Sequence, residues 1–188
     1  MDVARFIIEV YFNTRSPQRR RAERKPTTRM AAAAAPTVVV VDARHCAAEA
    51  TAFAVARVIG TTERDFAVTD AAGAVVMRVE GAVFSLRKRT LLDAARRPVL
   101  TMTDSTYLMS SMWHAFRGDS TSRRSVLFSV VKESVVQVRT KIFVYLGGYR
   151  SADQVPDFVI GGNYYGGACT VFAGNSDSDA DAAIAQVS

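Results

Sequence analysis

The feature that most constrains this chain is a series of short β-prone runs that begins at Thr37. The runs are rich in Val, Ile, Phe, Tyr and Thr, and turn residues such as Gly, Asp, Asn, Ser and Pro separate them. They cover residues 37–41, 52–60, 65–70, 72–81, 83–93, 98–109, 112–118, 125–134, 135–147, 156–162 and 168–174. Runs of this composition at intervals of about 8–12 residues are typical of antiparallel strands joined by tight connections. The sequence therefore predicts a mainly antiparallel all-β fold, either a barrel or a sandwich.

Two connections between these runs have recognisable turn chemistry. Residues 69–75 predict a hairpin turn in which Gly73 supplies a positive φ, and residues 92–99 predict a second turn that ends at Pro98. No amphipathic helix of twelve or more residues is predicted between the runs. Residues 107–116 fit either one or two turns of helix or a strand with a bulge.

Positive charge is concentrated at the beginning of the chain. The formal net charge is +6 over 188 residues. Residues 1–29 hold eight basic and three acidic side chains, whereas the remaining residues hold 16 and 15. We therefore predict a disordered, basic, Ala-rich extension over residues 1–36 and a nearly neutral domain over residues 37–188. The alternative for the extension is a targeting peptide or a basic arm for nuclear import or membrane contact.

Neither a disulfide framework nor a membrane span is predicted. Cys46 and Cys169 lie far apart, and the sequence has no secretory signal, which favours reduced thiols. The longest apolar stretch, residues 31–41, is shorter than the roughly 20 residues that a spanning helix needs and contains Pro36. These observations predict a cytoplasmic or nuclear protein, or one that is peripheral to the plasma membrane.

Catalytic and metal-binding patterns are weak in this sequence. His45 precedes Cys46, but adjacent side chains in an extended chain face apart and do not form a catalytic dyad. The Gly-rich run "GGNYYGGACT" lacks the spacing of a nucleotide-binding loop, and no His, Cys, Asp and Glu cluster resembles a metal site. We predict a protein that is not an enzyme and needs no cofactor or metal.

The candidate binding residues are Arg87, Lys88 and Arg89, three consecutive cations in the run "VFSLRKRTLLD". Alternate side chains of a strand face opposite ways, so Arg87 and Arg89 are predicted on a solvated face. Lys88 is predicted on the other face, together with Phe84, Leu86, Thr90 and Leu92. The functional interpretation is contact with an anion or an anionic lipid, and the alternative is an ordinary solvated strand face with cross-strand ion pairs.

Several motifs together carry a family resemblance. The segments "TVVVVDARHCA", "DFAVTDAAGAVVMRVEG", "VFSLRKRTLLDAARRPVLTM", "WHAFRGDS", "VLFSVVKES", "DFVIGG" and "AIAQV" resemble, in order and spacing, the plant LURP-one-related family over residues 37–187. The resemblance implies a tubby-like barrel of about twelve antiparallel strands around a central hydrophobic C-terminal helix, related to phospholipid scramblases. It also implies a role in plant defence, and the wider superfamily is associated with phosphoinositide binding and membrane-tethered transcription regulators.

The chain departs from that family pattern at its C-terminus. It ends after "AIAQVS", where the resemblance implies a further strand and the apolar helix that fills the barrel. A barrel without that helix loses the burial of several large apolar side chains, each contributing about 1.5–3 kcal/mol. We therefore expect a C-terminally truncated barrel that is open, marginally stable, or completed by another segment.

These observations predict a non-enzymatic binding protein in plant defence. Its expected partner is an anionic phospholipid, such as a phosphoinositide on a membrane surface, or another protein. One alternative is a nuclear regulator whose basic arm associates with nucleic acid, because the barrel itself is not suited to bind nucleic acid. The other alternative is a truncated, functionally impaired family member.

Overall fold

The fold is a single antiparallel sheet of eleven strands, each paired with its neighbours in chain order. A computed structural model describes residues 39–46, 51–58, 65–82, 87–105, 112–132, 141–149, 151, 153–163, 168–174 and 183–187. The strands are β1 (Ala54–Arg57), β2 (Phe66–Thr69), β3 (Val75–Gly81), β4 (Lys88–Asp93), β5 (Pro98–Asp104), β6 (Met112–Arg117), β7 (Val126–Lys132), β8 (Ile142–Leu146), β9 (Phe158–Asn163), β10 (Ala168–Ala173) and β11 (Ala183–Val187). Two short 3-10 helices, η1 (Ala43–His45) and η2 (Arg123–Ser125), are the helices in the described residues.

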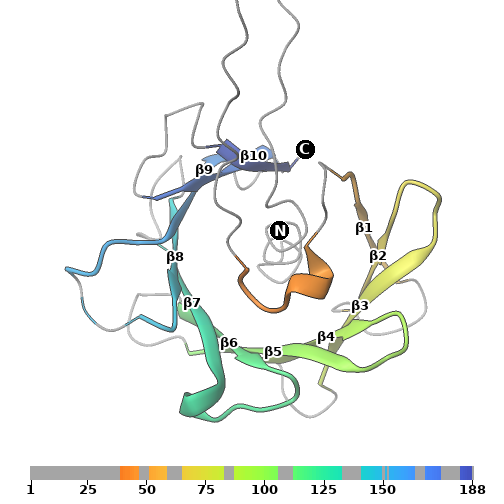
Figure 1. The fold of residues 1–188 in the computed structure, drawn as a ribbon, viewed down its shortest axis with the longest axis horizontal. Coiled ribbons are helices and arrows are strands. Elements are labelled where there is room, and N and C mark those ends of the chain that lie inside the picture. The colour runs from red at the N-terminus through yellow and green to blue at the C-terminus, as the bar shows by residue number, and fades with distance from the viewer. Residues whose placement is uncertain are drawn as a thin grey trace, which may run out of the picture.

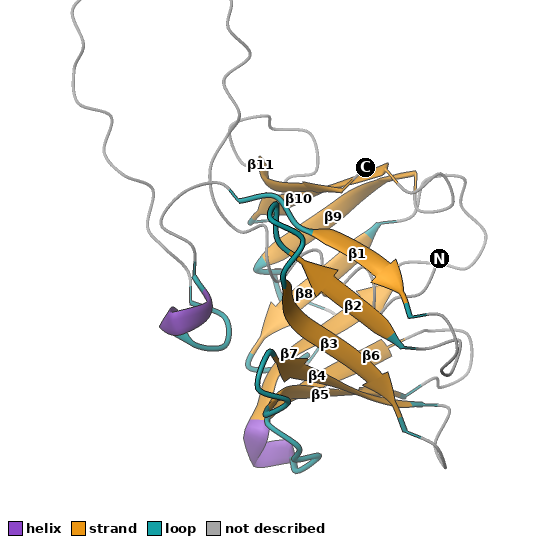
Figure 2. Ribbon diagram, turned by 90° about the vertical axis from the view of Figure 1, so that its right-hand side faces the viewer, coloured by secondary structure: helices purple, strands orange, loops and turns teal. Residues whose placement is uncertain are grey.

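The sheet curls around a central axis, so that its strands form most of a ring (Figure 1). Strands β1 and β11 stand at the two ends of the strand order. Seen from the side, the strands run obliquely along the wall (Figure 2). The predicted antiparallel all-β class and barrel-like architecture are therefore confirmed, with the sheet open between its first and last strands. The basic extension over residues 1–36 lies outside the described residues.

Local sequence explains the two predicted turns. Between β2 and β3, Gly73 has a φ of +80°, and Asp70 Oδ1 accepts hydrogen bonds from the backbone N–H groups of Ala72 and Ala74, each at 2.9 Å. Between β4 and β5, Pro98 is the first residue of the new strand, as expected from its missing N–H. The positive φ of this second turn, 62°, belongs to Arg96 and not to a glycine.

The core lies on the inner face of the curled sheet, and every strand contributes to it. Its buried or packed members from the strands include Val55, Val68, Val79, Leu91, Leu100, Ala115, Val130, Val144, Ile160, Val171 and Ala185. Residues 39–41, which are predicted as part of a strand, do not belong to any strand. Val41 nevertheless joins this core with 8% exposure, because the segment that carries it lies against one end of the barrel. Apolar composition at this position reflects burial of Val41 and partial burial of Val40 against the core rather than sheet pairing.

A close approach of two chains explains one glycine of the "GGNYYGG" run. Gly162 in β9 has a φ of +142° and pairs with Cys169 in β10. A Cβ atom at this position would lie 2.5 Å from the carbonyl oxygen of Ala168, closer than real Cβ atoms come. Only glycine therefore fits at this point of the β9–β10 pairing.

Candidate functional site

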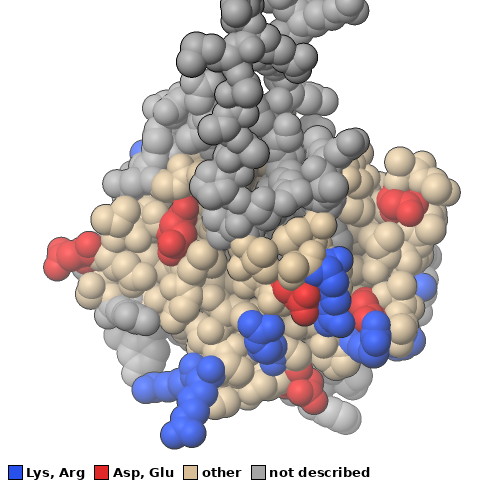
Figure 3. All heavy atoms as spheres, in the orientation of Figure 1, with Lys and Arg blue, Asp and Glu red and all other residues tan. Residues whose placement is uncertain are grey.

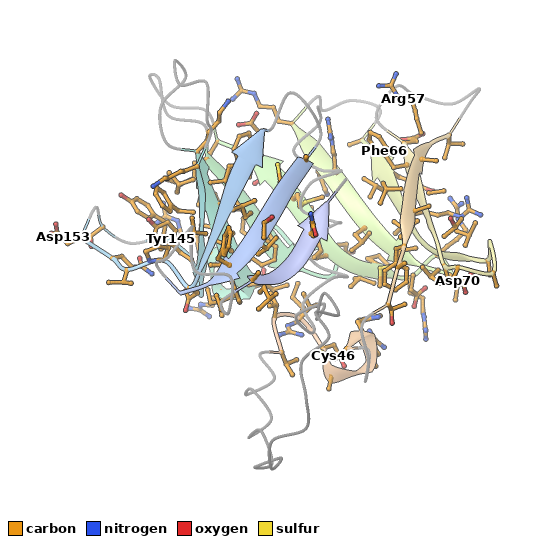
Figure 4. The ribbon with its side chains drawn as sticks, turned by 90° about the horizontal axis from the view of Figure 1, so that it is seen from above. Cys46, Arg57, Phe66, Asp70, Tyr145 and Asp153 are labelled. Atoms are coloured by element: carbon orange, nitrogen blue, oxygen red, sulfur yellow. The ribbon has the colours of Figure 1, made fainter. Side chains whose placement is uncertain are left out.

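Antiparallel pairing gives the barrel two different ends. One is the capped end, at which segment 39–46 lies over the ring, near the last residue of β6, Arg117. The other is the basic end, defined by Arg57, Arg87, Lys88, Arg89, Lys132 and Lys141, at or next to the ends of β1, β4, β7 and β8. Figure 4 shows Cys46 and Arg57 at these opposite ends of the molecule.

The excess positive charge of the described residues lies at the basic end. Its six basic residues compare with three acidic ones among the described residues, Asp65, Glu80 and Asp104. The capped end carries six basic residues and six acidic ones: Arg44, Arg96, Arg97, Arg117, Arg123 and Arg124, with Asp42, Asp70, Asp93, Asp119, Asp153 and Asp157. Figure 3 looks at the capped end, where basic and acidic side chains are interspersed. Arg78 lies in the middle of β3, and Glu80 is ion-paired with Arg96 at 2.7 Å.

The structure places the predicted cations on two faces of β4, but the assignment of those faces is reversed. Arg89 lies opposite Met102 and shares its face with Leu91, so it faces the barrel interior at the basic end. Lys88 lies opposite Thr103 on the outer face. Buried leucines occupy both faces of β4, Leu91 inside and Leu92 outside, so leucine positions alone do not reveal which face is the core.

Arg87 lies just before β4, where its side chain is exposed. Its carbonyl oxygen accepts a hydrogen bond from the backbone N–H of Asp104 at 3.0 Å, which extends the β4–β5 pairing by one residue. The three predicted cations are therefore brought together at one end of one strand, with Lys88 and Arg89 on opposite faces. Their role in anion binding stays a prediction.

Two further cations join Arg89 on the inner side of the basic end. Arg57 is the partner of the buried Phe66, and Lys132 is the partner of the buried Ile142. Residues directly opposite one another in antiparallel strands face the same way, so the basic side chains of β1, β4 and β7 border the interior. Strand register places them at the same end and on the same inner side although Arg57 and Lys132 are 75 positions apart, so the local sequence pattern does not point to these two residues.

Sequence comparison identifies the relatives of this chain. The sequence model of the family described as LURP-one-related matches residues 51–188. The chain belongs to the LURP-one-related family. This LURP-one-related chain is 36% identical over 142 residues to protein LURP-one-related 15 of Arabidopsis thaliana, which covers 74% of the chain and 65% of the relative. It is 32% identical over 142 residues to Arabidopsis protein LURP1, with 74% and 68% covered.

A solved structure supports the same relationship. The crystal structure of an Arabidopsis thaliana protein matches the LURP-one-related chain with a TM-score of 0.60 and 32% identity, over 79% of this chain and 78% of the other. The tubby-like superfamily implied by the resemblance is consistent with this fold. The chain spans about two thirds of the length of the curated relatives it matches, 65% of the first of them.

The LURP-one-related domain also holds a serine and histidine pair that sequence reasoning missed. His114 Nδ1 lies 2.8 Å from Ser129 Oγ, between the neighbouring strands β6 and β7. Ser129 is fully buried, and among the described residues no carboxylate bonds to His114 to orient it as a catalytic base. The pair therefore lacks the accessible nucleophile of a hydrolase. The only sequence signal for this pair is that each of the two apolar strands carries one polar residue at the position where the strands pair.

The segment near His45 and Cys46 forms no catalytic dyad. His45 Nε2 accepts a hydrogen bond from Arg44 Nε at 3.1 Å, while Cys46 Sγ lies 3.8 Å from the Asp42 carbonyl oxygen. The backbone N–H of Arg44, and less strongly the nearby cations, lower the pKa of Asp42, which caps η1. Neither Cys46 nor Cys169 forms a disulfide with the described residues.

The described parts of the chain offer neither a metal site nor a membrane-spanning helix. No group of three or more His, Cys, Asp and Glu residues there is placed to hold a metal ion. None of the helices in those parts is long and apolar enough to cross a membrane.

Proposed function

We propose that this LURP-one-related protein is a non-enzymatic binding module whose basic end contacts an anionic phospholipid surface. The observation that carries this proposal is the uneven charge of the described residues, with six basic and three acidic residues at one end of the barrel and balanced charge at the other. The family resemblance supports a phosphoinositide as the lipid and plant defence as the setting.

The strength of such a contact follows from simple electrostatics. A basic side chain near an anionic leaflet contributes about 1 kcal/mol, and the attraction falls off within a Debye length of about 8 Å at physiological ionic strength. Cations gathered at one end act together because they approach the surface at the same time. Cations spread evenly over the molecule would not.

A matched pair of double variants tests this proposal. Arg87→Ala with Arg89→Ala removes two charges from the basic end, and Arg123→Ala with Arg124→Ala removes two exposed charges from the capped end. We expect the first variant to lose about tenfold or more of its affinity for phosphatidylcholine vesicles that contain a phosphoinositide. We expect the second to bind nearly as well as the original protein in the same vesicle sedimentation assay. Equal losses in both variants would show that total charge matters and not the basic end.

A nucleic-acid-associated regulator is the second candidate, because eight of the 24 basic residues lie within residues 1–29. A triple variant of the full chain distinguishes the two candidate functions: Arg19→Gln with Arg20→Gln and Arg21→Gln. If the extension carries the function, this variant loses binding to duplex DNA of any sequence, and binding of the original protein falls steeply with salt. Vesicle binding that survives in this variant but falls in the Arg87 and Arg89 variant supports the barrel.

A further inference from the structure

Strand register places four polar side chains in one row across the outer face of the sheet. Lys88 lies opposite Thr103, Thr103 opposite His114, and His114 opposite Ser129. The 2.8 Å contact between His114 and Ser129 confirms that their side chains share a face. Four consecutive strands, β4 to β7, thus each contribute one polar residue.

The far end of this row is rigid and fixes the histidine ring. Ser129 is fully buried, and its Oγ atom lies 2.8 Å from His114 Nδ1, so this hydrogen bond is shielded from solvent. Its hydrogen bond occupies Nδ1 of His114 and leaves Nε2 on the opposite side of the ring. Since either group can donate in that bond, the tautomer that carries a proton on Nε2 is available without moving the ring.

The near end of the row supplies a cation. Lys88 is half-buried, and its side chain makes no ion pair or hydrogen bond with the described residues. Neighbouring strands lie about 4.8 Å apart, so the backbones of Lys88 and His114 are separated by about 10 Å with Thr103 between them. The lysine side chain and the imidazole therefore flank Thr103 on its two sides.

We propose that Lys88, Thr103 and His114 form a binding site for a phosphate group on the outer face of the sheet. The three donors are an ammonium, a hydroxyl and an imidazole N–H, and they approach from three directions. A tetrahedral phosphate has enough oxygens to accept from all three, whereas a planar carboxylate has two. The site needs no membrane, so it stands or falls independently of the proposed lipid contact.

The charged groups that share this face favour an anion. Around His114, the titratable groups on the same face are Lys88 of β4 and Tyr145, which lies opposite Ser129. Glu80 of β3 faces the same way, but its carboxylate is ion-paired with Arg96 at 2.7 Å. Burial lowers the pKa of His114. A bound dianion opposes this effect, so binding and protonation of His114 strengthen one another.

Nuclear magnetic resonance of the histidine side chain tests the site in the full chain. Addition of inorganic phosphate is expected to shift the His114 ring nitrogen signals in a saturable way and to raise the pKa of His114. Sulfate, whose charge is constant over the same pH range, is expected to bind more tightly as the pH falls. Lys88→Met and Thr103→Val are each expected to weaken binding by about tenfold, as expected for loss of a charge-assisted hydrogen bond.

Lys141→Met is the matched control, because it removes one lysine from the same end without touching the row. Unchanged phosphate affinity in Lys88→Met, or an equal loss in Lys141→Met, would overturn the proposal. Competition identifies the source of the phosphate. If vesicles that contain a phosphoinositide displace inorganic phosphate from His114 and phosphatidylcholine vesicles do not, the site is assigned to a lipid headgroup. If inorganic phosphate binds and these vesicles do not displace it, the site is assigned to a soluble phosphate compound.

Discussion

Arg117 Nη1 donates a hydrogen bond to the carbonyl oxygen of Val41 at 3.1 Å, between residues 76 positions apart. The bond ties segment 39–46 to the last residue of β6, and Val41 places its side chain in the barrel core. Val40 also packs against this core, so the segment is held by one polar contact and by two apolar side chains.

Arg117→Ala is expected to loosen this segment. Loss of the hydrogen bond should lower the free energy of unfolding by about 1 kcal/mol. It should also speed tryptic cleavage after Arg44, which mass spectrometry of timed digests measures. Arg123→Ala, which removes an exposed arginine from the same end, serves as the control. Unchanged cleavage after Arg44 in Arg117→Ala would show that Val41 alone holds the segment.

Gly162→Ala is expected to destabilise the protein severely. Its Cβ atom would meet the Ala168 carbonyl oxygen at 2.5 Å, and its φ of +142° disfavours any side chain. We expect a loss of at least about 3 kcal/mol in urea denaturation, in the range of severe backbone effects. Gly73→Ala has a φ of +80° but open space around the new Cβ, so its cost should be only about 1 kcal/mol. Similar losses for the two variants would contradict the close approach of β9 and β10.

His114 is expected to make stability depend on pH. Burial lowers its pKa in the folded state, so the folded protein binds fewer protons than the unfolded chain, whose histidine pKa is about 6.5. Its contribution to stability is therefore complete above about pH 6.5 and is lost as the pH falls. Thermal melts in phosphate-free buffer should show this loss, and His114→Gln should flatten the profile in this window. An unchanged slope in His114→Gln would argue against desolvation of this ring.

Asp93 is expected to make stability depend on pH in a more acidic range than His114 does. The backbone N–H of Arg97 and the Arg97 guanidinium, at 2.8 Å from Asp93 Oδ2, lower the pKa of this carboxylate despite the opposing effect of burial. Its stabilising contribution is present above the unfolded value of about 3.9 and is lost as the pH falls through the folded pKa.

Asp93→Asn should therefore be less stable than the original protein near neutral pH, and the difference should shrink in strong acid. Asp119→Asn, at an exposed position in the β6–β7 connection, is the control. A constant difference between Asp93→Asn and the original protein at every pH would show that the charge of Asp93 contributes nothing.

Local sequence predicted most strands and the class of the fold, because strand composition and turn chemistry are local properties. Gly73 and Pro98 fall where the turn rules place them. Residues 37–41 were assigned to a strand for the same local reason, but Val41 is buried by a contact with distant parts of the chain. Composition alone does not distinguish these two causes of an apolar run.

The faces of the strands, and therefore the site, required the register. Arg89 faces inward and Lys88 outward because of how β4 pairs with β3 and β5. The row from Lys88 to Ser129 joins residues 41 positions apart, and each looks like an isolated polar residue in its own strand. Bulges at Leu91, Ala115 and Val171 interrupt the register further, so simple alternation does not carry across the sheet.

The unequal ends of the barrel give the described part of the protein an electric dipole along the ring axis. A negatively charged surface exerts a torque on such a body and turns its positive end forward before any specific contact forms. The ring axis would then stand perpendicular to that surface. Segment 39–46 and the hairpin that carries η2 would point back toward the solvent, where they remain accessible to a second macromolecule while the first contact is held.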